Sequence, residues 1–181
     1  MEQRRYVLMD RDGVINHDSE DFIKSPEEWR PIDGSLEAIA LLNKHGFDVV
    51  VITNQSGLAR GLFDVAMLSK IHDKMHRLLA QKGGQIASIY YCPHGPDELC
   101  NCRKPKPGLL EQFALEMKVD LKSVFFIGDS LRDIQAAQAV GAKPILVLTG
   151  KGQLTLDKNP NLNIPVFENL YAAVQFISSK Q

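Results

Sequence analysis

Residues 6–14 read YVLMDRDGV, and this stretch decides the fold. An apolar run ends at Met9 and is followed at once by Asp10 and Asp12. Side chains two apart on a strand point to the same side, and α/β proteins bind ligands where strands end. Two adjacent carboxylates repel unless a cation or a proton joins them, and Mg²⁺ is a common partner. The pair indicates either a magnesium site suited to phosphoryl transfer or an Asp-rich turn.

Similar short apolar runs recur along the chain and alternate with amphipathic stretches. Their uniformly apolar character favours strands buried on both faces. We expect strands at 6–9, 48–53, 86–91, 124–127 and 145–148, helices at 35–44 (capped by Ser35), 64–81, 107–118, 130–140 and 168–178, and a surface loop at 151–163. This alternation predicts an α/β fold: a single Rossmann-like domain over residues 1–181, with a parallel sheet flanked by helices.

The bulk composition narrows the class of protein. A chain of 181 residues fits one domain, and 44% hydrophobic with 24% charged residues is typical of a soluble globular protein. A net charge of −1 argues against nucleic-acid binding. No stretch predicts a membrane span, and the first residues lack the pattern of a signal peptide. We expect a cytoplasmic monomer that acts on a small molecule.

A polar run follows the second expected strand. Thr53, Asn54, Gln55 and Ser56 offer hydroxyl, amide and backbone N–H groups that can hold phosphate oxygens. An ordinary polar loop is the alternative. Arg60 lies a few residues further on and could pair with an anionic ligand or be solvated.

The three cysteines of the chain lie close together in the sequence. Cys92, Cys100 and Cys102, with His94, form a set of zinc ligands at close range. Four protein ligands leave no open coordination position, so we expect a structural zinc loop at about 92–102. The other histidines are expected on the surface or on helix faces, and His17 is a minor candidate because it is close to the acid pair: His17, His45, His72 and His76.

Charged residues follow the zinc loop and the fourth expected strand. Arg103 and Lys104 come directly after Cys102, so the metal would restrict where they point, and both suit phosphate binding. A solvated basic turn is the alternative. Asp129 could complete a magnesium site or simply cap a helix. Asp133, one helical turn later, is expected to brace Lys104 or to cap the turn.

In their order, these motifs resemble the haloacid dehalogenase (HAD) superfamily of phosphatases over nearly the whole chain. The resemblance implies that Asp10 is the nucleophile and Asp12 the general acid/base, and that Thr53 and Lys104 orient and stabilise the phosphoryl group. It implies that Asp10, the backbone carbonyl of Asp12, and Asp129 bind Mg²⁺. No insertion is large enough for a separate domain, which implies a capless member. The matching positions are Asp10, Asp12, Gly13, Val14, Thr53, Lys104, Gly128, Asp129, Ser130 and Asp133.

The cysteine motif resembles one subgroup of that superfamily, which contains heptose-bisphosphate and histidinol-phosphate phosphatases. The run at 53–61 and the segment at 22–29 are similar to the heptose enzymes. The resemblance implies removal of the 7-phosphate of D-glycero-D-manno-heptose 1,7-bisphosphate through an aspartyl-phosphate, a step of ADP-heptose (lipopolysaccharide core) biosynthesis. Arg103 would hold the other phosphate. The residues expected to contact substrate are Arg11, Asp18, Ser19, Glu20, Asp21, Asn54, Gln55, Ser56 and Arg103.

Three other functions stay open from the sequence. The short interval between His94 and Cys100 is shared with histidinol-phosphate phosphatases, and Ser130 stands where some heptose enzymes carry lysine. A receiver-type signalling domain also joins acids, Thr and Lys, but it would place Asp after a middle strand, and none follows residues 49–52. A catalytically silent phosphate-binding module is the third, although no essential side chain is missing.

Overall fold

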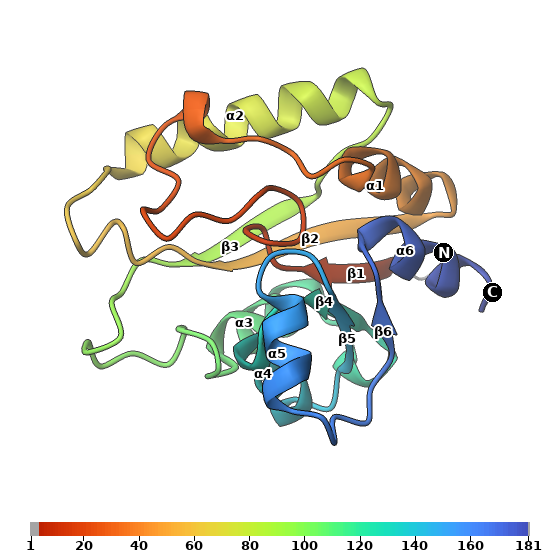
Figure 1. The fold of residues 1–181 in the computed structure, drawn as a ribbon. Coiled ribbons are helices and arrows are strands. Elements are labelled where there is room, and N and C mark those ends of the chain that lie inside the picture. The colour runs from red at the N-terminus through yellow and green to blue at the C-terminus, as the bar shows by residue number, and fades with distance from the viewer. Residues whose placement is uncertain (1–3, 181) are drawn as a thin grey trace.

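Six strands form one parallel sheet in a computed structural model that describes residues 4–180 (Figure 1). The spatial order is β3-β2-β1-β4-β5-β6, so β1 lies inside the sheet and pairs in parallel with β2 and β4. The strands are β1 (Arg5–Met9), β2 (Phe47–Asn54), β3 (Ser88–Cys92), β4 (Phe125–Gly128), β5 (Lys143–Val147) and β6 (Val166–Phe167). The expected α/β fold with a parallel sheet is confirmed.

Helices cover both faces of the sheet (Figure 1). Buried residues of α1, α2 and α6 pack on one face, and those of α3 and α4 pack on the other. The helices are α1 (Ser35–Lys44), α2 (Val65–Gln81), α3 (Gly108–Met117), α4 (Leu131–Ala139), α5 (Gly152–Lys158) and α6 (Leu170–Ser178). Between residues 4 and 180, the remaining helical elements are two single 3-10 turns, Pro26–Glu28 and Leu121–Ser123, which agrees with a fold that has no cap domain.

The residues of β1 show why this strand lies inside the sheet. Val7 and Met9 belong to the core on the α1/α2/α6 side, while Tyr6 and Leu8 belong to the core on the α3/α4 side. Neighbouring side chains of a strand point to opposite faces of the sheet, so the run from Tyr6 to Met9 packs into the cores on both faces. The chain then leaves the sheet at Asp10, next to the crevice between β1 and β4, where the chain connections diverge.

Three local expectations are wrong. Ser35 does not cap α1: Gly34 holds that position with φ of 82°, and the buried Ser35 hydroxyl donates to the carbonyl of Val14 at 2.9 Å. The segment 151–163, expected as a surface loop, contains α5. The sequence does not predict this helix, because the periodic signal of seven residues is weak beside the neighbouring Asn and Pro residues. The strand β6 was not expected, since two residues give no pattern of alternation.

Candidate active site

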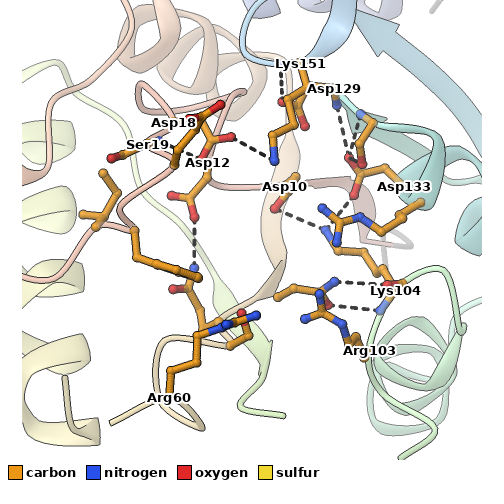
Figure 2. A pocket seen from close by; sticks show the side chains of 18 residues that line it. Asp10, Asp12, Asp18, Ser19, Arg60, Arg103, Lys104, Asp129, Asp133 and Lys151 are labelled. Carbon is orange, nitrogen blue, oxygen red and sulfur yellow. Dashed lines mark hydrogen bonds and ion pairs between the residues drawn. The ribbon is translucent and has the colours of Figure 1, made fainter. Parts of the chain in front are cut away.

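The predicted site residues converge at the carboxyl ends of the strands. Asp10 follows β1, Asn54 ends β2 and Asp129 follows β4, so all three border one cavity (Figure 2). Residues expected from the sequence that line it are Asp10, Asp12, Asp18, Ser19, Glu20, Asn54, Gln55, Ser56, Arg103, Lys104 and Asp129. The cavity is also lined by Phe22, Ile23, Arg60, Ser130, Arg132, Asp133 and Lys151.

Lys104 lies at the centre of an acidic cluster. Its ammonium nitrogen lies 2.6 Å from Asp133 Oδ1 and 3.2 Å from Asp10 Oδ1, and it also donates to the carbonyl of Ile52 at 2.8 Å. Asp10, Asp129 and Asp133 bring carboxylate oxygens within 4.8 Å of one another. One ammonium therefore faces three carboxylates, and the excess negative charge suits a cation.

The pKa values of the cluster show the same imbalance. Burial, and then the charge of Asp133, raise the pKa of Asp10 well above its ordinary value. The same two causes raise the pKa of Asp129 to about 7. Burial alone would lower the pKa of Lys104, but Asp10 and Asp133 raise it, so the ammonium stays charged. A divalent cation would relieve the repulsion that holds these carboxyl pKa values up.

Asp133 differs from the other two acids because hydrogen bonds already engage both of its oxygens. Oδ1 accepts from Lys104, and Oδ2 accepts from the backbone N–H groups of Asp129 and Ser130 and from the Ser130 hydroxyl. Ser130 and Asp133 thereby form the capping box of α4. Asp133 both braces Lys104 and caps the turn, and the carboxylates of Asp10 and Asp129 remain for a metal ion.

The carboxylate of Asp12 lies outside that cluster. Its Oδ1 accepts from Arg11 Nε at 3.0 Å and from Asn16 Nδ2 at 2.9 Å, and its Oδ2 accepts from Gln55 Nε2 at 3.3 Å. Burial would raise the pKa of Asp12, but the charge of Arg11 and these hydrogen bonds bring it below its ordinary value. The side chain of Asp12 therefore rests ionised, and its oxygens are held by Arg11, Asn16 and Gln55 rather than by the acidic cluster.

Three of the expected site residues do not reach the cavity. Arg11 was expected to bind substrate, but its side chain is fully buried and turns away toward α2. Thr53 is buried as well, and its hydroxyl oxygen accepts from Gln55 Nε2 at 3.0 Å. Asp21 lies on the exposed loop without lining the cavity. The buried side chain of Arg11 does not support the expected contact with substrate, and a sequence pattern does not say which side of a loop a long side chain takes.

The position of His72 also differs from the prediction. The sequence placed it among surface or helix-face histidines, yet His72 on α2 is buried and its Nε2 lies 3.1 Å from Arg11 Nη1. No signal in the sequence pairs two residues 61 positions apart. Its i+3 neighbour Met75 and the preceding Ile71 face the core, which is the one hint that this side of the helix is buried.

The segment after the cysteines is held on both sides. Asn54 Nδ2 donates to the carbonyl of Lys104 at 3.1 Å, and the Lys104 N–H donates back to Asn54 Oδ1 at 3.0 Å. Arg103 Nη1 donates to the carbonyl of His94 at 3.3 Å. The end of β2 and the cysteine loop therefore fix where Lys104 and Arg103 enter the cavity.

The four expected zinc ligands lie together. Cys92 Sγ is 3.9 Å from Cys100 Sγ and 3.5 Å from His94 Nδ1, and His94 Nδ1 is 3.4 Å from Cys102 Sγ. A tetrahedral zinc with Zn–S bonds of about 2.3 Å keeps its ligand atoms roughly 3.3–3.8 Å apart. Cys92 and Cys102 are closer, at 2.9 Å between sulfurs, well beyond a disulfide bond of about 2.05 Å. The donor set fits a zinc ion.

A parallel α/β sheet with an acid pair, a buried lysine and further carboxylates at its crevice defines a hydrolase of the phosphoryl-transfer type. Residues 101–173 match the family model described as HAD-hydrolase-like. A D-glycero-beta-D-manno-heptose-1,7-bisphosphate 7-phosphatase of Pseudomonas putida is 51% identical over 93% of this chain and 96% of its own. One of Bordetella bronchiseptica is 57% identical over 84% and 85%. The chain belongs to the HAD-like hydrolases and, within them, to the family of these relatives.

The solved structures include a neighbour that contains ligands. The crystal structure of the D,D-heptose 1,7-bisphosphate phosphatase from B. bronchiseptica, complexed with magnesium and phosphate, superposes with a TM-score of 0.95 at 50% identity, covering 98% of this chain and 99% of the other. The corresponding phosphatase from Burkholderia thailandensis gives a TM-score of 0.77 at 41% identity, covering 97% and 99%. The match therefore extends over nearly the whole chain.

Proposed function

We propose that this chain is a magnesium-dependent phosphatase that removes the 7-phosphate of D-glycero-D-manno-heptose 1,7-bisphosphate. The observation that carries the proposal is the placement of Asp10 and Asp129 beside Lys104 at the crevice between β1 and β4. The family relatives bear the name of this activity, and one was solved with magnesium and phosphate. The biosynthetic setting, the cytoplasm and the monomeric state stay predictions. Within residues 4–180, no helix combines the length and apolar character needed to cross a bilayer.

In the first step, Asp10 Oδ attacks phosphorus and the bond from phosphorus to the sugar oxygen breaks. Asp12 gives that oxygen its proton. Because Asp12 rests ionised, it takes this proton from solvent, and only when the negative charge of the incoming phosphate raises its pKa; the proton that it gains from water in the second step returns to solvent. Lys104 lies against Asp10 and offsets the charge that develops on the transferring group.

In the second step, Asp12 takes a proton from water, and the water oxygen attacks the phosphorus of the aspartyl-phosphate. The aspartyl P–O bond breaks, inorganic phosphate leaves and Asp10 is restored. The side chains of Asp10 and Asp129 and the carbonyl of Asp12 would hold Mg²⁺, which neutralises charge on the phosphoryl oxygens. Asp133 keeps Lys104 aimed at this point.

The outer part of the cavity favours a substrate with a second phosphate. Arg60, Arg103 and Arg132 all line it. Burial, and then the charge of Arg132, lower the pKa of Arg103, so these guanidinium groups lie close enough to act on one anion. A bisphosphate places a second anion in this region, whereas histidinol phosphate carries one phosphate and an amine. The arginines therefore favour the heptose bisphosphate over the histidinol substrate.

Turnover by the purified chain tests the proposal. Heptose 1,7-bisphosphate and histidinol phosphate are compared side by side with added Mg²⁺. We expect the bisphosphate to be the better substrate, and we expect Asp10→Asn to lower turnover by about 10³-fold or more because the nucleophile is lost. Near-normal activity of this variant would refute the mechanism, and a preference for histidinol phosphate would refute the substrate.

We propose further that Cys92, His94, Cys100 and Cys102 hold a structural zinc ion. The ion would fix the loop that precedes Arg103, so its loss lowers both thermal stability and activity. Elemental analysis of the purified chain should find about one zinc per molecule, and Cys102→Ser should lower that content. A metal-free chain with an unchanged melting temperature would contradict the site.

A further inference from the structure

Arg11 lies behind the acid pair as a fully buried cation. Its Nε donates to Asp12 Oδ1 at 3.0 Å, and its Nη2 lies 2.9 Å from the same oxygen. A buried guanidinium is expensive to desolvate and persists when its partners fix its geometry. Asp12 is the one carboxylate paired with it among the described residues, so the cation is dedicated to this acid.

The other end of the guanidinium is held from α2. Arg11 Nη1 lies 3.1 Å from His72 Nε2, and both side chains are buried. Arginine has no acceptor, so Arg11 donates and His72 Nε2 accepts through its lone pair. Burial, and then the positive charge of Arg11, lower the pKa of His72 to about 3, which keeps the imidazole neutral and able to accept at neutral pH.

The two oxygens of Asp12 are treated differently by this arrangement. Oδ1 faces Arg11 and Asn16, whereas Oδ2 has a single, longer hydrogen bond of 3.3 Å from Gln55. The Asp12 side chain lines the cavity (Figure 2). Oδ1 is the anchored oxygen, and Oδ2 is the one with lone pairs left for a proton in transit.

We propose that His72 is a positioning residue: it fixes Arg11, and Arg11 fixes the Asp12 carboxylate so that Oδ2 carries the proton to and from the sugar oxygen. This rests on the proposed phosphatase function. The competing explanation is a buried His–Arg pair that only stabilises the packing of α2. The two differ in what they do to the chemistry, because a positioning role changes proton transfer selectively, whereas a packing role changes stability and all substrates alike.

The test compares leaving groups in the magnesium-loaded enzyme. With enzyme in excess, release of the leaving group in a single turnover reports only the first step. In that step the sugar oxygen needs a proton, whereas p-nitrophenolate leaves without one. We expect His72→Leu to slow the first step about tenfold on heptose bisphosphate and less than about twofold on p-nitrophenyl phosphate, a fraction of the full contribution of a general acid. His72→Gln, which keeps an acceptor for Arg11, should restore the rate. His76→Leu, on the exposed side of the same helix, is the matched control and should change neither.

Equal slowing on both substrates, or no slowing on either, would overturn the positioning role. If His72→Leu does not fold, His72→Asn, whose shorter amide falls short of Arg11, takes its place with the same expected pattern. Failure of the underlying function is recognised separately, because then the wild-type chain releases no phosphate from heptose bisphosphate. If the wild-type enzyme turns over both substrates and His72→Leu is slowed equally on both, the positioning role of His72 is refuted and the phosphatase function stands.

Discussion

Asp10 and Asp12 lie two residues apart after the same strand, yet their carboxylates have opposite surroundings. Asp10 meets other acids, and its pKa is raised; Asp12 meets Arg11 and two amides, and its pKa is lowered. Identical side chains thus acquire different surroundings from their neighbours, which suit Asp10 to the proposed role of nucleophile and Asp12 to the proposed role of proton carrier. The sign of each shift follows from which elements of the fold supply those neighbours.

The backbone explains how the two acids part. Asp10 still belongs to the sheet edge, since its N–H donates to the carbonyl of Ile127 on β4 at 3.0 Å. The chain then turns at Gly13, whose φ of 83° lies in the left-handed region that favours glycine. A side chain would also have no room there, because a Cβ would lie 2.0 Å from Asp129 Oδ2. Asp10 is therefore directed to the β4 and α4 side, and Asp12 to the α2 side.

The strongest way to separate the two acids is to neutralise one at a time. Asp12→Asn is expected to lower kcat by about 10²–10⁴-fold, because it removes the proton carrier and keeps its size. Since the metal contact proposed for Asp12 is its backbone carbonyl, which Asn keeps, the Mg²⁺ concentration for half-maximal activity should stay nearly unchanged. The matched variant Asp129→Asn removes a carboxylate ligand and should raise that concentration about tenfold or more. Magnesium titrations of turnover check both, and equal shifts in the two variants would contradict the division.

The acidic side of the comparison depends on Lys104. Its replacement by Met leaves Asp10 and Asp133 buried without their cation, and we expect a loss of about 3–5 kcal/mol in the free energy of unfolding. The loss should be smaller at pH 5 than at pH 8, because the folded carboxyl pKa values then exceed the unfolded ones and protonation relieves the repulsion. Urea unfolding at the two pH values measures it. Lys158→Met, at an exposed position of α5, serves as the control, and a pH-independent loss would exclude buried charge as the cause.

The parts of this site that could be predicted are those that a strand end fixes. Apolar runs locate β1, β2 and β4, and the polar residue that follows each run must lie at one edge of a parallel sheet. Asp10, Asn54 and Asp129 follow from that rule alone. The cysteine spacing added the loop that holds Lys104.

What could not be predicted depends on side-chain direction and on contacts between distant segments. Arg11 sits between Asp10 and Asp12, which both line the cavity, but its side chain leaves the cavity because a buried acceptor on α2 is within reach. Thr53, one of the expected phosphate partners, instead meets Gln55. Lys151 reaches the cavity from the segment expected to be a loop, where its N–H donates to Asp129 Oδ2 at 2.8 Å. A rotamer or a short helix decides each case, and neither leaves a periodic trace in the sequence.

The basic side of the comparison gives the smallest effect, a dependence of stability on pH. His72 has a pKa of about 3 in the folded chain and an ordinary value near 6.5 when unfolded. A histidine with a lowered folded pKa contributes its full stability above the unfolded pKa and loses it as the pH falls, because only the unfolded state then binds the proton. Between pH 7 and pH 5 this amounts to about 1–2 kcal/mol. From pH 7 to pH 5, the free energy of unfolding of the wild type should therefore fall by that amount more than the free energy of unfolding of His72→Gln. His76→Gln should show the same pH dependence as the wild type. A wild type and a His72→Gln variant with the same pH slope would show that burial and Arg11 do not hold His72 neutral, and the anchoring of Asp12 would then need another cause.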